Sequence, residues 1–305
     1  MKKPRIVVIG LCGMSVFMNV AAFPNLGETQ TAKTISYEVG GKGFNQALAA
    51  KKMDGEVHFI SIIGTDETSK ICEQTLREKG IIPHLIKKEG NSALAFILIN
   101  KLGENQVTVH QGITNQLCSS DIEKYEAVIK TADILVLQFE IPINANKKAI
   151  EIANKYQIKT IINPAPPHKF SINNIKGNII LTPNEYEARM IFNLSPTEKI
   201  EQKIIHNKKG QLENIIITIG KQGCLVLSDE KFLSIPGLKV IARDTTGAGD
   251  IFNGVLAYFI AYGKPIIEAA QLANIASGLS VTKYNVLDSI PNKEEIMIYL
   301  NKQDK

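Results

Sequence analysis

The sequence lacks the features that a metal centre, a disulfide framework or an export signal would require. Its four cysteines are far apart with no C-x-x-C pair, and its five histidines are equally scattered, so zinc-ligand spacing is absent. Isolated thiols without a secretion signal indicate a reducing compartment, and we therefore expect a cytoplasmic protein. The cysteines are Cys12, Cys72, Cys118 and Cys224.

Basic blocks and long apolar runs are missing as well. The formal net charge of +5 comes from lysines spread over the chain, unlike the basic arms that bind nucleic acid. No run reaches the length that crosses a membrane, and the short opening stretch MKKPRIVVIG predicts a first core strand rather than a signal peptide. We therefore expect neither nucleic acid nor a membrane as a partner.

The composition that remains is that of an ordinary globular protein, with 44% hydrophobic and 21% charged residues over 305 positions. Short β-branched runs that are apolar on both faces alternate with stretches of helical apolar spacing. This alternation predicts one doubly wound α/β domain over residues 1–305, with a mainly parallel sheet flanked by helices and binding sites at the carboxyl ends of the strands. The expected strands are 5–10, 57–63, 133–138, 159–163, 178–182 and 214–219, and the expected helices are 43–53, 66–80, 121–132, 144–156 and 184–192.

Two segments, residues 14–39 and 92–110, break this alternation and have the character of extended strands joined by turns such as KLGEN. We expect them to form a small β-sheet that projects from the main domain. Because such a sheet cannot bury both of its faces alone, it would cover a site as a lid, pair with a second copy of the chain, or do both.

The turn DTTGAGD, residues 244–250, lies between an expected strand, LKVIAR, and an apolar helix. At a helix N-terminus, unpaired N–H groups and the helix dipole favour an anion, and glycines let the backbone approach it closely. A Walker A loop would need Lys and Ser or Thr where Asp250 and Ile251 stand, and the acidic residue of a Rossmann fingerprint would fall at Glu268, inside an expected helix. The turn is then either an anion hole that carries a carboxylate base, or a helix start that the Asp merely caps.

A second glycine cluster, GGKGFNQALAA at residues 40–50, also precedes an expected helix. Alone it would equally be a tight turn with an exposed lysine. Taken together, the two glycine-rich helix starts suggest opposite walls of one cleft, with a phosphate on one wall and a polar acceptor on the other.

GGKGFNQA and DTTGAGDIFNG resemble the two signatures of the PfkB or ribokinase family of carbohydrate kinases, and the resemblance runs over nearly the whole chain. It implies a ribokinase-like fold and Mg²⁺-dependent transfer of the γ-phosphoryl group of ATP to a hydroxyl of a small sugar or sugar-like alcohol. It assigns the general base to Asp250, a role worth on the order of 10² to 10⁴ in rate, and the anion hole to the backbone of Gly247, Ala248 and Gly249. Other matching stretches are QFEIP (138–142), NPAPP (163–167), TPNEYEA (182–188), ITIGKQG (217–223) and LANIASG (272–278).

The resemblance also implies where the nucleotide and its magnesium ion lie. Asn184 and Glu187, in the NEYE motif, would place Mg²⁺ and phosphate. Because magnesium keeps several waters, a small set of protein ligands is expected. The residues implied to hold the nucleotide are Thr218, Gly220, Gly223, Gly249 and Asn274.

A monovalent-cation site, usually for potassium, is implied beside the anion hole. Asp244 and Thr246 match it, and asparagine stands at position 285 where the family usually has glycine. Asparagine tolerates a positive φ better than other non-glycine residues, so we expect the loop to keep its shape. The loop residues implied in this site are Ser280, Lys283, Asn285 and Ser289.

The acceptor side departs from the family pattern after the first strand. Ribokinase-like sequences have an Asn and an Asp there, and the Asp binds the diol of the sugar, whereas this chain has Gly13 and Ser15. A hydroxyl cannot replace a carboxylate as a charge-assisted acceptor of two hydrogen bonds. The kinase prediction stands, but ribose is not assigned as the acceptor. The other acceptor-side residues that the resemblance implies are Gly41, Lys42, Asn45, Glu140 and Asp250.

Three alternatives to a simple sugar kinase stay open. A nucleoside kinase of the same fold would use Val16, Phe17 and Met18 as an apolar base pocket, although these side chains would equally pack the lid. A phosphosugar kinase is disfavoured, because the chain has four arginines and none lies in the lid segments. A non-catalytic nucleotide- or sugar-binding regulator is disfavoured by the intact glycine turn with both of its aspartates. We also expect a homodimer formed through the lid.

Overall fold

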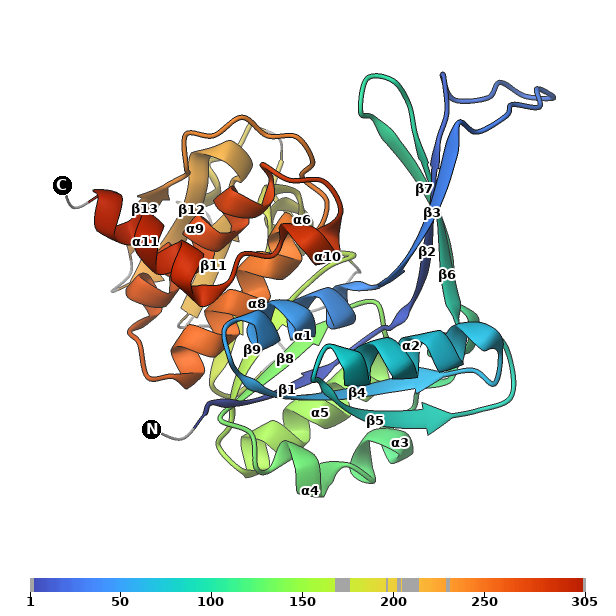
Figure 1. Ribbon diagram of the computed structural model, residues 1–305. Helices are drawn as coiled ribbons and strands as arrows, with labels where there is room; N and C mark the ends of the chain where they lie inside the picture. The colour runs from blue at the N-terminus through green and yellow to red at the C-terminus, as the bar shows by residue number, and fades with distance from the viewer. Residues whose placement is uncertain are drawn as a thin grey trace.

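The computed structural model describes residues 3–167, 176–195, 197–201, 204, 214–228 and 231–303. Over these residues the chain forms a nine-stranded sheet with helices on both faces, and a four-stranded sheet that projects from it (Figure 1). The prediction of a doubly wound α/β fold with a small projecting sheet is confirmed.

The larger sheet contains every strand that the apolar runs predict. In order across the sheet, its strands are β13 (Lys231–Pro236), β12 (Gly223–Ser228), β11 (Asn214–Thr218), β10 (Ile179–Leu181), β9 (Lys159–Asn163), β8 (Ile134–Gln138), β1 (Arg5–Ile9), β4 (Glu56–Ile63) and β5 (Ile82–Lys87). Pairing is parallel from β11 to β5, and β12 and β13 add an antiparallel hairpin at one edge. The parallel part therefore directs its carboxyl ends to one edge, where sites of this fold class lie.

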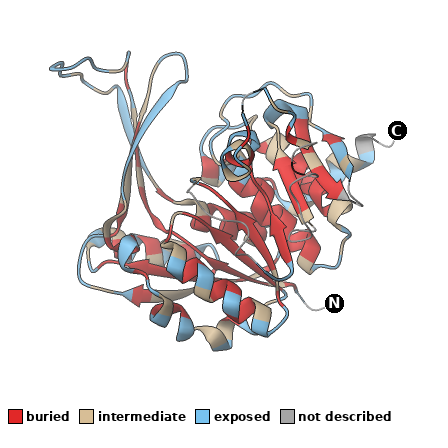
Figure 2. Cartoon of the chain, turned by 180° about the vertical axis from the view of Figure 1, so that it is seen from behind, coloured by how far each residue is buried: buried red, intermediate tan, exposed pale blue. Residues whose placement is uncertain are grey.

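Helices cover both faces of this sheet. They are α1 (Lys42–Lys52), α2 (Glu67–Glu78), α3 (Ser119–Glu123), α4 (Glu126–Ile129), α5 (Ile143–Lys155), α6 (Glu185–Ile191), α8 (Ala248–Ala261), α9 (Ile266–Ser280), α10 (Val286–Ser289) and α11 (Lys293–Gln303), with 3-10 turns η1 (Gly112–Gln116) and η3 (Gly220–Gln222). Successive side chains of a strand point to opposite faces, so Ile6 and Val8 join one buried cluster with α1, α8 and α9, and Val7 and Ile9 join another with α3 and α5. Figure 2 shows that buried residues, coloured red, are concentrated in the large sheet and in the helices against it.

Helix α8 approaches α1 closely at a glycine. A Cβ added to Gly254 would lie 2.3 Å from the backbone oxygen of Gln46 and 2.6 Å from the Cβ of Ala49. Backbone atoms of a packed helix cannot move aside for such a contact. Gly254 therefore determines how closely the two helices meet.

Two local predictions are wrong. The stretch 121–132 is not one helix, because the chain leaves the helical path between α3 and α4, where Tyr125 turns its ring edge-on toward His84. The stretch LKVIAR, residues 238–243, is not a strand. The chain leaves the sheet edge after β13, Ile241 is 87% exposed, and the N–H of Arg243 donates to the carbonyl of Val281 in the loop after α9.

We call the smaller sheet the lid. Its strand order is β3 (Thr34–Gly40), β2 (Gly13–Asn19), β6 (Ala93–Ile99) and β7 (Asn105–His110), so the two segments 14–39 and 92–110 supply it. The side chains of β2 alternate between two environments. Those of Val16 and Met18 pack toward the main core, whereas those of Ser15 and Phe17 line a cavity. None of the helices in the described part of the chain is long and apolar enough to cross a membrane.

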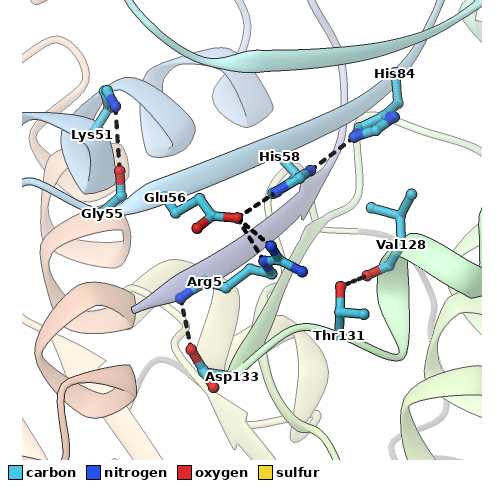
Figure 3. Close-up of polar contacts among 9 residues, drawn as sticks. All are labelled: Arg5, Lys51, Gly55, Glu56, His58, His84, Val128, Thr131 and Asp133. Carbon is cyan, nitrogen blue, oxygen red and sulfur yellow. Dashed lines mark hydrogen bonds and ion pairs between the residues drawn. The ribbon is translucent and has the colours of Figure 1, made fainter. Parts of the chain in front are cut away.

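A chain of polar contacts joins neighbouring strands near the amino end of the large sheet (Figure 3). The carboxylate of Glu56 accepts from Arg5 Nε at 2.7 Å and lies 3.1 Å from His58 Nε2, while His58 Nδ1 lies 2.9 Å from His84 Nε2. The N–H of Arg5 donates to the carboxylate of Asp133 at 2.7 Å. Within the described residues, no group of three or more His, Cys, Asp or Glu side chains is arranged to hold a metal ion. These contacts tie β1, β4, β5 and the start of β8 together.

Candidate active site

Asp250 lies in the first turn of α8, where the two glycine-rich helix starts meet. It is only 5% exposed, and both of its carboxylate oxygens accept hydrogen bonds from α1. Asn45 Nδ2 donates to one oxygen at 3.0 Å, and Gln46 Nε2 donates to the other at 3.1 Å. The carboxylate is therefore held in one orientation by a helix from the opposite end of the chain.

The turn before Asp250 presents backbone N–H groups that are free to bind an anion. Within the described part of the chain, the N–H groups of Gly247 and Gly249 have no acceptor, whereas that of Ala248 donates to the carbonyl of Thr245 at 3.3 Å. Gly247 caps the helix with a φ of 74°, a conformation that favours glycine. Free N–H groups and the positive end of the helix dipole together suit a phosphate group.

A buried network of amides stands behind Asp250, and the sequence did not reveal it. Gln46 Oε1 accepts from Gln138 Nε2 at 2.7 Å, and Gln46 Nε2 lies 3.2 Å from Asn163 Oδ1. Asn163 Nδ2 in turn donates to the carbonyl of Thr182 at 3.1 Å. The first of these bonds fixes which end of the Gln46 amide faces Asp250, because its oxygen is already engaged by Gln138.

The same network returns to the glycine turn. The hydroxyl of Thr182 lies 2.6 Å from Asn253 Oδ1, and Asn253 Nδ2 donates to the carbonyl of Gly249 at 2.8 Å. The network thus joins the carboxylate of Asp250 to the turn that carries the free N–H groups. All of its members lie in the stretches GGKGFNQA, QFEIP, NPAPP, TPNEYEA and DTTGAGDIFNG, so these motifs were the signal that could have identified them.

Lys42 supplies a positive charge to the site. The charge of Asp250 raises its pKa, burial opposes that effect, and Glu140 and Glu187 add to it. Burial raises the pKa of Glu140 to about 7, the nearby Lys42 opposes this effect, and the backbone N–H of Lys42 donates to Glu140 Oε2 at 2.7 Å. Lys42 is therefore held protonated among carboxylates, where it can also face a phosphate.

A cavity of about 670 Å³ opens between the lid and the starts of α1 and α8. It brings the predicted acceptor residues together with the glycine turn and with part of the predicted cation site. The predicted residues that line it are Gly13, Ser15, Gly41, Lys42, Asn45, Glu140, Asp244, Thr246, Gly247, Asp250 and Asn285.

The residues predicted to hold the nucleotide form a second group, outside this lining. Asn184 caps α6 and exchanges hydrogen bonds with Glu187, which is 6% exposed and has its pKa raised by burial. The N–H of Thr218, at the end of β11, donates to the carbonyl of Pro183, next to Asn184. These three residues therefore lie at the carboxyl ends of neighbouring parallel strands.

Apart from Gly249, which lies in the first turn of α8, the rest of the nucleotide group surrounds the edge hairpin. Gly223 begins β12, and an added Cβ there would lie 2.0 Å from the carbonyl of Ile235. Gly220 has a φ of 58° with open space around it, and Asn274 donates from α9 to the carbonyl of Pro236 at 2.8 Å. Asn274 is thus partly engaged in joining α9 to β13.

The predicted cation residues bring two loops together. The carboxylate of Asp244 accepts from the N–H of Thr246 at 2.9 Å, and the N–H of Asp244 donates to the carbonyl of Val281 at 3.2 Å. Asn285 has a φ of 64°, as expected for a position that usually carries glycine. Ser280 and Ser289 are buried, and the N–H groups of Lys283 and Ser289 donate to the carbonyls of Ser280 and Asn285.

Comparison with known proteins gives the site its context. Residues 3–293 match the family model described as pfkB family carbohydrate kinase. The ribokinase of Haemophilus influenzae is 32% identical over 303 residues, covering 98% of this chain and 99% of that protein. The crystal structure of ribokinase from Thermotoga maritima has a TM-score of 0.88 at 29% identity, covering 98% of this chain and 100% of that one. The structure of Arabidopsis thaliana ribokinase complexed with ribose and ATP shares the fold, with a TM-score of 0.84 at 24% identity and coverage of 98% and 99%.

The chain therefore belongs to the pfkB family of carbohydrate kinases. It is an ATP-dependent sugar kinase, a phosphotransferase with an alcohol group as acceptor.

Proposed function

We propose that the chain transfers the γ-phosphoryl group of ATP to a hydroxyl of a small sugar or sugar-like alcohol, with Asp250 as the general base. The observation that carries this proposal is the position of the Asp250 carboxylate, oriented by two amides and adjoining both a cavity and free backbone N–H groups. A carboxylate in that position can take a proton while the adjacent N–H groups bind phosphate oxygens.

The residues divide the reaction between them. The acceptor hydroxyl gives its proton to Asp250 as its oxygen forms a bond to the γ-phosphorus. The bond from that phosphorus to the bridging oxygen breaks, and ADP leaves with the electron pair. The N–H groups of Gly247 and Gly249 and the ammonium of Lys42 neutralise the oxygens of the transferred group, which is the main demand of phosphoryl transfer.

We place magnesium beside Glu187, held through water. Both Glu187 oxygens already accept from Asn184, at 2.8 Å from its N–H and 2.9 Å from its amide, and Mg²⁺ usually keeps several of its waters. When bound, the ion neutralises phosphate charge. We assign Glu187 and Asn184 to its outer shell, and loss of turnover in EDTA with recovery in excess Mg²⁺ tests the requirement.

The acceptor class follows from what lines the cavity. Asn45 Oδ1 is buried without a hydrogen-bond partner among the described residues, so it is available to a sugar hydroxyl. Of the three residues that a nucleoside base would need, only Phe17 lines the cavity, whereas Val16 and Met18 pack toward the core. A coupled ADP-release screen over pentoses, hexoses, polyols and nucleosides tests the proposal. A nucleoside as the best substrate would replace the sugar assignment, and no ADP release with any acceptor would overturn the proposed function.

A monovalent cation, K⁺, is proposed beside the glycine turn. Asp244 supplies one charge there, and the loop over residues 280–289 supplies backbone carbonyls. Because the ion would steady Asp244 and Thr246 next to the anion hole, we expect turnover to fall several-fold when potassium is replaced by tetramethylammonium at equal ionic strength. Sodium, which is smaller than potassium, serves as a second comparison. Equal rates in all three salts would remove this site.

A dimer through the lid is proposed from exposed apolar side chains on the strands that flank β2. Val16 pairs with Tyr37 on one side and Phe96 on the other, so Tyr37 and Phe96 share one face, and both are exposed. We expect sedimentation velocity at micromolar concentration to show a dimer that Tyr37→Glu converts to a monomer. Tyr186→Glu is the matched control, because Tyr186 on α6 is 64% exposed and Tyr37 is 63% exposed. A monomeric native chain would contradict the proposal.

A further inference from the structure

Two neighbouring residue pairs of the lid line one part of the cavity. The first pair consists of two glycines, and the second pair includes a carboxylate. Gly13 on β2 pairs with Gly40 on β3, and the next pair on the same face is Ser15 with Glu38. A Cβ at Gly40 would lie 2.7 Å from the Ser15 hydroxyl, and one at Gly13 would lie 2.4 Å from the carbonyl of Ala93. Glycine at position 40 therefore keeps the space beside Ser15 open, and glycine at position 13 lets β2 lie close to the backbone of β6.

Glu38 is a carboxylate without a partner. It lines the cavity and is half-buried, yet no described residue forms a hydrogen bond or ion pair with it. Burial raises the pKa of Glu38, and the negative charges of Asp288 and Asp244 raise it further. A half-buried charge among like charges costs free energy unless a ligand satisfies it. Its position thus indicates a binding group rather than a stabilising contact.

We propose that Glu38 determines acceptor specificity by accepting hydrogen bonds from two hydroxyl groups of the acceptor. This inference rests on the proposed kinase function. The two oxygens of a carboxylate suit a pair of neighbouring hydroxyls, and hydrogen bonds to a charged acceptor are the stronger kind. Asp250 takes the hydroxyl that is phosphorylated, so Glu38 holds the acceptor at a different position.

The carboxylate of Glu38 lies on β3, whereas the family pattern has an aspartate at the position of Ser15 on β2. Neighbouring strands lie about 4.8 Å apart, and Glu38 stands on β3 directly opposite Ser15 on β2. The longer glutamate side chain reaches over the glycine floor from β3, while β2 presents a hydroxyl. The acceptor is therefore bound by a residue of β3. This strand leads directly into α1, which carries the two amides that orient Asp250.

Steady-state kinetics of Glu38→Gln tests this assignment. With the sugar that has the highest kcat/KM in the acceptor screen, we expect KM for the sugar to rise on the order of 10- to 100-fold, with KM for ATP unchanged. The native chain should also discriminate against the monodeoxy analogue that lacks one of the two hydroxyls, and Glu38→Gln should lose that discrimination. Glu28→Gln is the matched control, because Glu28 lies in the β2–β3 connection away from the cavity. A thermal unfolding midpoint equal to that of the native chain shows that the variant folds.

A second variant moves the carboxylate between strands. Ser15→Asp combined with Glu38→Ala should recover part of the sugar affinity that Glu38→Ala alone loses. An unchanged KM for the sugar in Glu38→Gln would overturn the proposal, and so would a loss of potassium activation with the KM for the sugar unchanged. Either result would leave the kinase assignment intact, since the native chain would still phosphorylate the sugar.

Discussion

Asp250→Asn should reduce kcat by on the order of 10² to 10⁴ while ATP still binds. The variant removes the proposed proton acceptor, but it leaves the N–H groups of the glycine turn in place. The new NH₂ group can replace the oxygen that faces Asn45, because Asn45 Oδ1 has no partner among the described residues and can accept from it once the Asn45 amide turns. Isothermal titration with ATP and single-turnover kinetics separate these effects.

Asp133→Asn is the control for this substitution. Asp133 accepts from the N–H of Arg5 near the amino end of the large sheet, where the carboxylate has no part in phosphoryl transfer. We expect its kcat to equal that of the native chain. If Asp250→Asn kept full turnover with the best acceptor, Asp250 would not be the base, and the proton would have to leave by another route.

Gly254→Ala should destabilise the fold by about 1–3 kcal/mol or more, as overpacked cores do. The added methyl would lie 2.3 Å from the backbone oxygen of Gln46. The two helices would have to separate, and Gln46 would move away from Asp250 with them. Urea unfolding measures the loss of stability, and kcat should fall as well.

Gly249→Ala is the matched control in the same helix. A Cβ at Gly249 would meet nothing within 4 Å, so the exchange should leave stability unchanged or raise it by about 0.5–1 kcal/mol, since alanine favours helix. Equal stability of the two variants would show that the α1–α8 contact is not tight. Loss of activity in Gly249→Ala without loss of stability would support the assignment of this turn to the anion hole.

The interior strands were predictable from the sequence because helices cover them on both sides. Their runs are continuously apolar, and all six occur as strands within one or two residues of the expected bounds. The interior strand β12 was not among the expected strands, and the edge strands β5 and β13 were not predictable in this way. β5 contains Pro83 and His84, and β13 is largely exposed, so neither has the continuous apolar run of an interior strand.

The site was predictable where glycine spacing and an adjacent carboxylate define a turn. The structure brings Asp250, Asn45 and Lys42 together, and Asn285 has a positive φ. The amide network was not predictable from periodicity. Its members are separated by up to 207 residues between Gln46 and Asn253, and their contacts depend on α1 packing against α8 and on the strand ends that face both helices. Only the packed fold specifies which donor faces which acceptor.

The lid strand β3 runs into helix α1 with a single residue, Gly41, between them. Glu38, Lys42, Asn45 and Gln46 therefore belong to one uninterrupted piece of chain. One continuous segment therefore carries both the residue proposed to select the acceptor and the residues that orient the base. Exchanging residues 34–52 for the corresponding segment of a relative would transfer acceptor selection and base orientation together. Exchanging β2 alone would alter the lining of the cavity and leave the position of Asp250 unchanged.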